Sequence, residues 1–451
     1  MSAHQRESST LRFLPLTFRH GIHPPEHKDD TKALPIQQFP FAPVLAVPFL
    51  QHVGKPAKAV VCEGQEVVRG QVLAEADGAM SVPVHAPVSA VVKQLTLIPL
   101  VDGSKVPGAV LQADAGSTQE VADGEPCPLD KATPQEILRA IQRAGVVGLG
   151  GAAFPSHVKL TIPPDKTIDT LLINGAECEP YLTTDHRVML EQTADIVTGI
   201  RYLLKATGAP RAIIGIEANK RDAADALRDV LGASPELPVA IEVLPVKYPQ
   251  GAEKMLIKSL LKREVPAGAH SIDVGVVGVN VATAAEIGRL LPHGRGMQER
   301  VVTIGGPAIK RKGNYRIPVG TPLRFVLEYV GVTGEIDEVF LGGPMMGHAV
   351  GDLDAPIVKG TSGVIAFPKR ATVAVYPCIH CGRCVEGCPV LLNPSRLGQL
   401  AAAQAYEKMR DEFYLLDCFE CGVCSYVCPS HIPLVQQFRV AKRALKKEKA
   451  V

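Results

Sequence analysis

Short β-branched runs separated by turns follow the N-terminal segment of the chain. Between residue 44 and about residue 111, the runs at 59–61, 66–68, 71–74 and 89–93 are three to five residues long, with glycine or proline recurring between them. Apolar runs this short, punctuated by turn residues, indicate a small all-β unit.

Beyond about residue 130 the apolar positions take helical spacing and alternate with buried strands. Thr133, Pro134 and Glu136 supply an N-cap, a proline at the first helical position and an acid at the third, and Gly145 supplies the stop. This alternation predicts a doubly wound parallel sheet. The expected strands are 170–173, 212–216 and 241–246, and the expected helices are 187–206, 221–231 and 252–261.

The rest of the chain gives weaker patterns. Residues 1 to about 40 are rich in proline and histidine, which favours an extended segment laid across other domains. Its histidines are irregularly spaced, so we expect a structural role for them rather than metal binding. Residues 298–363 read as strand, helix and strand with Gly-Gly-Pro corners. From Phe438 a basic helix is expected, either solvated or docked on anionic lipid or a partner.

One cysteine spacing is written twice near the end of the chain. Each copy reads Cys-x2-Cys-x2-Cys-x3-Cys-Pro, which is the spacing of ligands to 4Fe-4S clusters. In proteins with two such runs, the fourth cysteine of each run binds the other cluster. We therefore expect two clusters, one on Cys378, Cys381, Cys384 and Cys428 and the other on Cys418, Cys421, Cys424 and Cys388.

Zinc and disulfides are the alternative uses of these cysteines. Zinc sites usually place two of their ligands a dozen or more residues from the other two, and disulfides need an oxidising compartment that nothing in this sequence suggests. Cys62, Cys127 and Cys178 remain outside the two runs. For each of them we expect a small buried side chain.

A glycine-rich loop is the most informative feature outside the cysteines. It contains Gly148, Gly150 and Gly151, then Phe154 and Lys159. Glycines at this density let backbone amides approach a phosphate, and a lysine nearby adds a cation. Tight turns and close packing produce such loops as often, so the loop alone does not establish a phosphate site.

Polar residues follow the predicted strands at the edge where ligands bind in open α/β sheets. Asn174, Glu177 and Glu179 come after the first strand, and Glu217 ends the second. Such carboxylates suit hydroxyl-rich ligands such as ribose or ribityl, although solvated loop glutamates would look the same. The sequence thus favours a nucleotide-like ligand at this edge.

Composition and charge exclude several functions. The net charge is +2 and tryptophan is absent, so neither a basic patch nor a stacking platform for nucleic acid is indicated. No apolar run approaches the ~20 residues of a membrane span. The N-terminus has no apolar signal core, so we expect a soluble protein that stays in the cytoplasm.

Two resemblances join these motifs. Residues 67–92 resemble half of a biotinyl- or lipoyl-type barrel-sandwich domain, but Asp77 to Met80 at the hairpin tip contain no lysine, which favours a scaffold. The glycine loop and the strand-end polar residues resemble the FMN- and NADH-binding fold of the flavin subunit of respiratory complex I. With the motif 21–26, the motif 248–254 and the doubled cysteine run, the chain resembles the C subunits of Rnf-type (Rsx-type) ion-translocating complexes.

The resemblance implies a division of the chain and a fold. It implies a multidomain α/β protein in which a small β-grasp (SLBB-like) domain holds the flavin unit against the cluster unit. The expected parts are an extended segment at 1–43, a barrel-sandwich-like β domain at 44–125, a Rossmann-like FMN/NADH domain at 126–297, the β-grasp domain at 298–365 and an α-helical two-cluster ferredoxin domain at 366–451.

The resemblance also implies cofactor sites and partners. FMN would be held by Gly148, Gly150, Gly151, Lys159, Asn174, Glu177 and Glu217, with Phe154 and Glu179 nearer the NADH. No side chain needs to act as acid or base, because hydride and electron transfer are the cofactors' chemistry. The chain would be a peripheral oxidoreductase subunit on the cytoplasmic face of the bacterial inner membrane. Its partners would be the membrane subunits and the ferredoxin-like B subunit of the same complex.

Two other functions stay open at this point. A corrinoid reductase uses similar cofactors, although the N-terminal His-Pro-Pro segment ahead of the flavin loop argues against that domain order. A flavin-free, ferredoxin-like relay, in which the α/β unit is only a docking scaffold, is the alternative outside enzymology. Flavin content separates the relay from the NADH-dependent oxidoreductase.

Overall fold

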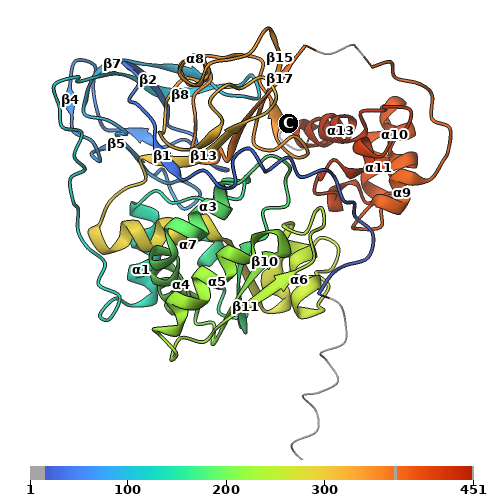
Figure 1. Ribbon diagram of the computed structural model, residues 1–451, viewed down its shortest axis with the longest axis horizontal. Helices are drawn as coiled ribbons and strands as arrows, with labels where there is room; N and C mark the ends of the chain where they lie inside the picture. The colour runs from blue at the N-terminus through green and yellow to red at the C-terminus, as the bar shows by residue number, and fades with distance from the viewer. Residues whose placement is uncertain (1–15, 370–372, 449–451) are drawn as a thin grey trace, which may run out of the picture.

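The computed structural model describes residues 16–369 and 373–448, and Figure 1 shows how the parts are arranged. The β-rich parts lie together in the upper left of the view, and the α/β part lies below them. The helices of the cysteine-rich part stand at the right, at the end of a long connection. The blue N-terminal segment runs between these three regions and touches each of them.

The first β unit consists of two small antiparallel sheets. Its core includes Leu45, Val47, Leu73 and Leu111, all fully buried. The predicted short strands are present, although the run expected at 59–61 pairs only at its start. One sheet contains β2 (Val44–Pro48), β8 (Lys105–Ala113), β7 (Ala90–Pro99) and β4 (Glu66–Val67), and the other contains β3 (Lys58–Ala59), β5 (Val72–Glu75) and β6 (Val84–His85).

The α/β part is built on a parallel sheet, as the alternation of strands and helices predicts. Its order is β11 (Val239–Leu244), β10 (Ala212–Glu217), β9 (Thr170–Gly175) and β12 (Val276–Asn280), and every neighbouring pair is parallel. β12 is an addition to the three expected strands. β11 ends two residues before the predicted end because Pro245 has no N–H to continue the ladder.

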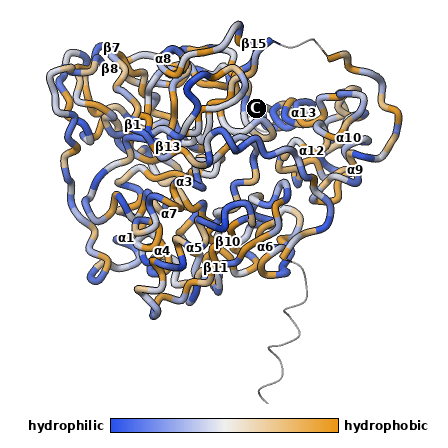
Figure 2. The backbone as a smooth tube through the Cα atoms, viewed as in Figure 1, coloured by the Kyte–Doolittle hydropathy of each residue, from blue (hydrophilic) through white to orange (hydrophobic). Residues whose placement is uncertain are grey.

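Helices cover both faces of this sheet. Leu171 and Ile173 of β9 point into the larger core, and Leu172 between them points into a smaller core on the opposite face. Figure 2 shows hydrophobic residues recurring along the sheet and the helices around it. The larger core is shared with α1 (Pro134–Arg143), α4 (Thr193–Thr207), α5 (Arg221–Gly232) and α7 (Val281–Leu290), and the smaller one with α6 (Glu253–Leu261).

Local signals set the ends of these helices. The predicted capping box of α1 is present, because Thr133 Oγ1 accepts from Glu136 N and the Glu136 carboxylate accepts from Thr133 N at 2.7 Å. The single helix expected at 187–206 is wrong: α3 (Thr184–Glu191) and α4 are separate. The backbone of Gln192 leaves helical geometry between them, at φ −127° and ψ 32°.

A six-stranded mixed sheet follows the α/β part. α8 (Leu323–Val330) packs on its core, and β1 (Ile36–Gln38) of the N-terminal segment adds to its edge in parallel with the neighbouring strand, β14 (Gly313–Pro318). The segment therefore lies across other parts of the protein, as expected for its described residues, while residues 1–15 lie outside the described structure. The sheet order is β1, β14 (Gly313–Pro318), β13 (Glu299–Gly305), β17 (Gly363–Pro368), β15 (Ile336–Leu341) and β16 (His348–Ala349).

The cysteine-rich part is helical and internally repeated. In both runs a glycine with positive φ, Gly382 at 79° and Gly422 at 78°, precedes a short helix. The basic helix expected from 438 begins earlier, at Leu434, and its expected end at 449 lies outside the described residues. None of the helices in the described ranges is long and apolar enough to cross a bilayer. The helices are α9 (Arg383–Gly387), α10 (Pro394–Ala402), α11 (Tyr406–Asp411), α12 (Val423–Tyr426) and α13 (Leu434–Glu448).

Candidate functional site

Two cavities in the helical part are lined by cysteines from both runs. One includes the first three cysteines of the first run together with Cys428, which is the fourth cysteine of the second run. The other includes the first three cysteines of the second run together with Cys388, which is the fourth of the first. The fold thus gathers Cys378, Cys381, Cys384 and Cys428 around cavity 1, and Cys388, Cys418, Cys421 and Cys424 around cavity 2.

Cavity 2 is the one that faces the α/β part. Tyr248 donates its hydroxyl to the backbone carbonyl of Cys421 at 2.7 Å. Gly422 packs against the carbonyl of Met345, which lies in a loop of the mixed sheet. Both cavities are lined only by residues of the helical part, but these two contacts from other parts of the chain reach the lining of cavity 2. Cavity 2 is therefore the inner cavity and cavity 1 the outer one.

The glycine-rich loop lies at the carboxyl edge of the parallel sheet. Gly150 and Gly151 are exposed, and a Cβ on Gly150 would stand 3.4 Å from Cβ of Asn280, at the end of β12. Gly151 has a φ of +108°, and Ala153 has a φ of 48° although an alanine stands there. Gly148 helps to close the loop, because its N–H donates to the carbonyl of Phe154 at 2.8 Å. Phe154 itself is half-buried.

The residues beside this loop fit a phosphate-bearing ligand. Lys159, on α2 (Ser156–Leu160), pairs with Glu253 through an Nζ–Oε2 distance of 2.7 Å, and both side chains are about one-third exposed. Glu253 Oε1 is buried and has no hydrogen-bond partner among the described residues. The exposed glycine loop and the lysine suit a phosphate, and the orphaned carboxylate oxygen of Glu253 could accept only from a donor group such as a hydroxyl of the same ligand.

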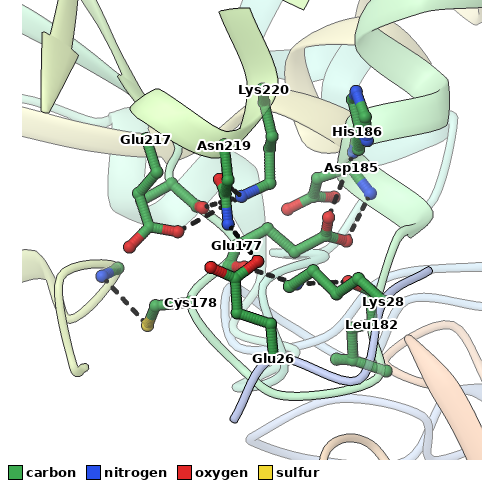
Figure 3. Close-up of polar contacts among 12 residues, drawn as sticks. Glu26, Lys28, Glu177, Cys178, Leu182, Asp185, His186, Glu217, Asn219 and Lys220 are labelled. Atoms are coloured by element: carbon green, nitrogen blue, oxygen red, sulfur yellow. Dashed lines mark hydrogen bonds and ion pairs between the residues drawn. The ribbon is translucent and has the colours of Figure 1, made fainter. Parts of the chain in front are cut away.

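The carboxylate of Glu177 is hydrogen-bonded within the protein and is not free to bind a ligand. Its Oε1 accepts from Asp185 N at 2.7 Å and its Oε2 from His186 N at 3.2 Å, so the carboxylate caps the start of α3 (Figure 3). Glu177 has a φ of 45°, a left-handed conformation that is unusual for glutamate. Asn174 is similarly engaged, because its Nδ2 donates to the carbonyl of Gly251 at 2.7 Å.

Buried lysines neutralise this acidic edge (Figure 3). Lys220 Nζ lies 3.2 Å from Glu217 Oε2, and both side chains are 1% exposed. Lys28, from the N-terminal segment, donates to the carbonyl of Glu177 at 2.9 Å and to that of Leu182. Burial lowers the pKa of Lys28 and raises the pKa of Glu217.

Glu179 points away from its neighbours on the chain and toward the mixed sheet. Its carboxylate accepts from Met345 N at 3.1 Å and Met346 N at 2.7 Å. Burial raises the pKa of Glu179 to about 7, against the lowering effect of these two hydrogen bonds. The glutamate expected near the nicotinamide therefore sits at the junction of the α/β part, the mixed sheet and the helical part.

Sequence reasoning misses several residues of this site. Asn280 caps α7 and donates from Nδ2 to Asp185 Oδ2 at 2.7 Å. Burial raises the pKa of Asp185, and the neighbouring Glu177 adds to the effect. A signal for Asn280 is present, as an N-cap after a β-branched run, but its strand is not among those expected. No pattern in the N-terminal segment marks Lys28 as a buried residue.

The three cysteines outside the two runs differ in how far they are exposed to solvent. Cys127 is 5% exposed, and Sγ of Cys178 accepts from Gly251 N at 3.2 Å, with its pKa raised by burial. For Cys62 the expected burial is wrong. It begins a surface turn, in which Gln65 N donates to the carbonyl of Cys62 at 3.2 Å, and the side chain of Cys62 is exposed.

Comparison with known families identifies three parts of the chain. Residues 16–116 match the RnfC barrel sandwich hybrid domain, residues 141–289 the Nuo51 FMN-binding domain, and residues 374–432 the 4Fe-4S dicluster domain. These matches confirm the expected barrel-sandwich and flavin domains. They also confirm that FMN and two 4Fe-4S clusters are the cofactors.

A solved structure shares the fold of most of the chain. It is the crystal structure of NAD+-reducing NiFe hydrogenase in the air-oxidized state, with a TM-score of 0.50 and 19% sequence identity. The likeness covers 72% of this chain and 70% of that one. It supports the multidomain architecture.

Relatives match along nearly the whole chain. The C subunit of the Na+-translocating ferredoxin:NAD+ oxidoreductase complex of Acetobacterium woodii is 40% identical, over 95% of this chain and 97% of that protein. The proton-translocating counterpart of Clostridium ljungdahlii is 40% identical over 94% and 93%. The C subunit of the ion-translocating oxidoreductase complex of Rhodobacter capsulatus is 38% identical over 95% and 83%. At this identity over this length, the chain belongs to the RnfC family, the C subunits of ion-translocating oxidoreductase complexes.

Proposed function

We propose that this chain is the peripheral electron-input subunit of an ion-translocating NADH:ferredoxin oxidoreductase complex. It would pass electrons between NAD(H), FMN and two 4Fe-4S clusters. The observation that carries the proposal is the placement of a cavity lined by four cysteines directly beside the loop that joins the flavin edge to α6. In this proposal, one polypeptide holds the FMN site and a 4Fe-4S cluster site next to each other.

Each cavity takes one cluster in this proposal. Cavity 1 would bind its cube through Cys378, Cys381, Cys384 and Cys428, and cavity 2 through Cys418, Cys421, Cys424 and Cys388. The crossed sets are supported because the fourth cysteine of each run lines the cavity of the other run. Since Tyr248 of the α/β part contacts Cys421, which lines cavity 2, electrons would pass between the flavin and cavity 2, then cavity 1, then a partner protein.

The flavin edge would hold FMN through backbone and side-chain groups. FMN supplies the exchange between a two-electron hydride and single electrons. Gly150 and Gly151 would admit the phosphate, with Gly148 shaping the loop and Lys159 supplying charge. Asn174, Glu177, Glu217 and Asn280 would shape the edge that holds the rest of the cofactor, because their side chains already bind other groups of this chain. Phe154 and Glu179 would lie nearer the NADH. None of these residues needs to move a proton.

The finer division of the chain follows from the same proposal. The segment 1–43, the β domain 44–125, the Rossmann-like flavin domain 126–297, the SLBB-like β-grasp domain 298–365 and the cluster domain 366–451 would be its parts. The mixed sheet supports the boundary between residues 365 and 366 only in part, because β17 continues to Pro368. Its Met345–Met346 loop joins the flavin and cluster domains, since it binds Glu179 and also accepts from Arg439 of α13 at Met346 O, 2.8 Å away.

The complex would place this chain on the cytoplasmic face of the bacterial inner membrane. Partners, including the ferredoxin-like B subunit and the membrane subunits, would hold it there. Anaerobic purification followed by measurement of FMN and iron tests the proposal. One FMN and about eight irons per chain are expected for one flavin and two cubes. Full iron without FMN, even after reconstitution with FMN, would leave only a flavin-free relay.

A further inference from the structure

The hydroxyl of Tyr248 links the flavin domain to the cluster domain and also lies beside the Glu179 carboxylate. The Tyr248 side chain is 1% exposed, and its hydroxyl donates to the carbonyl oxygen of Cys421 at 2.7 Å. Burial raises the pKa of Tyr248 well above its usual value, so the hydroxyl stays a donor at any physiological pH. The acceptor belongs to one of the four cysteines that line the inner cavity.

The same loop reaches the flavin edge three residues later. The carbonyl of Gly251 accepts from Asn174 Nδ2 at 2.7 Å, and its N–H donates to Cys178 Sγ at 3.2 Å. The loop 248–251 therefore contacts a proposed FMN residue at one end and a proposed cluster ligand at the other.

The N-terminal segment fixes this loop against the cluster domain. Ile22 and Tyr248 exchange two backbone hydrogen bonds, at 2.8 and 2.9 Å. Next to them, Gly21 N donates to the carbonyl of Gly387 in the first cysteine run at 3.2 Å. Gly21 has a φ of +77°, and a Cβ there would stand 2.6 Å from the carbonyl of Tyr248, so only glycine fits this junction.

We propose that Tyr248 is a positioning residue for electron transfer, which holds the inner cluster in register with the flavin and tunes its potential through the Cys421 backbone. This inference rests on the proposed function. In the step concerned, one electron would pass from a reduced flavin to an oxidised inner cluster, and the Tyr248 hydroxyl would keep its proton. A donor dipole aimed at the ligand backbone favours the cluster's more negative, reduced form.

Tyr248→Phe tests the proposal, because it removes the donor and keeps the ring. Tyr202→Phe is a matched control. Tyr202 is also a buried tyrosine, 2% exposed, whose hydroxyl donates to the backbone carbonyl of a cysteine, Cys127, which lies outside the cysteine runs. Both variants are made in the full chain, purified without oxygen, and compared in flavin content, iron content and spectroelectrochemical titration.

We expect Tyr248→Phe to keep its FMN and iron and to be reduced by NADH at the flavin as fast as the parent. Reduction of the clusters should slow by about ten-fold or more. The potential of one cluster should fall by up to about 59 mV, which corresponds to a ten-fold shift in a one-electron equilibrium. Tyr202→Phe should leave both quantities unchanged. The slowing and the shift should be absent if Tyr248 only packs.

The outcomes separate this inference from the function it rests on. A parent protein whose flavin NADH does not reduce overturns the proposed function. A parent that behaves as proposed, with Tyr248→Phe matching Tyr202→Phe in cluster potentials and reduction rates, overturns the role of Tyr248 alone. A Tyr248→Phe protein that shifts both clusters equally also overturns it, because only the inner cluster's ligand accepts the hydrogen bond.

Discussion

Lys28 Nζ donates to the backbone carbonyl of Glu177 at 2.9 Å, so an N-terminal residue supports the turn that carries the acidic edge of the flavin site. The same ammonium also donates to the carbonyl of Leu182. Around this lysine, Tyr181 N donates to the carbonyl of Glu26 at 2.8 Å, and Asn219 Nδ2 donates to Glu26 Oε2 at 2.8 Å. The N-terminal segment is therefore part of the site's structure.

Replacing Lys28 with methionine should weaken the flavin site. The change keeps the length of the side chain but leaves two buried carbonyls without their donor, which should lower the free energy of unfolding by about 1–3 kcal/mol. FMN affinity should fall with it, because the turn at Glu177 loosens. Lys32→Met is the control, since Lys32 is half exposed and pairs with Asp29 at the surface. Equal effects of the two variants in FMN titration would contradict the role of Lys28.

Lys359 should make stability depend on pH in the alkaline range. It is buried between the first β unit and α1, where Nζ donates to the carbonyls of Pro83 at 3.0 Å and Gly145 at 2.7 Å. Burial lowers its pKa to about 7 from 10.5. Between these values the unfolded chain binds the proton more tightly, so stability rises with pH up to about 10.5 and is lost as pH falls toward 7.

Lys359→Met should flatten that dependence. One group contributes a slope of at most about 1.4 kcal/mol per pH unit, which the variant should lose. Denaturant midpoints of parent and variant, measured at several pH values between about 7 and 10, give the comparison. Lys369→Met serves as the control, because Lys369 is 67% exposed at the surface. Parallel curves for parent and Lys359→Met would show that Lys359 does not titrate in this range.

The crossed cluster assignment predicts which cysteines act together. Cys428→Ser should remove the same cluster as Cys378→Ser, and Cys388→Ser the same cluster as Cys418→Ser, each with a loss of about four irons. Cys62→Ser should lose none, because Cys62 is an exposed cysteine outside both runs. Electron paramagnetic resonance of the remaining cluster distinguishes the pairs. If Cys428→Ser instead resembled Cys418→Ser, each run would bind its own cluster.

Gly151 should be needed for FMN but not for folding. Its φ of +108° disfavours any side chain, and an alanine there costs about 1–2 kcal/mol of backbone strain. Gly208→Ala is a matched control, because Gly208 is also exposed, has a φ of +69° and would place a Cβ in open space, but lies at the end of α4. FMN dissociation constants should rise at least ten-fold for Gly151→Ala only. Similar FMN binding by both variants would exclude the loop as the phosphate site.

Much of the architecture could be predicted from local signals. The capping box at Thr133 and the β-branched runs at 170–173 and 212–216 mark elements that the structure contains. The break at Gln192 could not be predicted, because packing between distant elements decides it, whereas β12 has a β-branched run that the prediction left out. For α3, the decisive contact is the capping carboxylate of Glu177, which no helical periodicity reveals.

The site could be predicted in its residue types more than in its geometry. The paired cysteine runs specify their chemistry through spacing alone, which is why the cavities could be anticipated. Glu177 and Glu179 were expected to face a ligand, yet both carboxylates accept hydrogen bonds from backbone amides of this chain. Lys28 and Tyr248 belong to the site because they bind residues more than a hundred positions away in the sequence. The sequence pattern carries no signal for those contacts.

Anaerobic titration of the purified full chain with NADH, following flavin and cluster absorbance together, is the decisive measurement of the proposed electron path. We expect NADH to bleach the flavin first and then both clusters, without any added mediator. Clusters that only dithionite reduces, in a protein that has retained its FMN, would contradict the electron path from NADH through the flavin to the inner cavity.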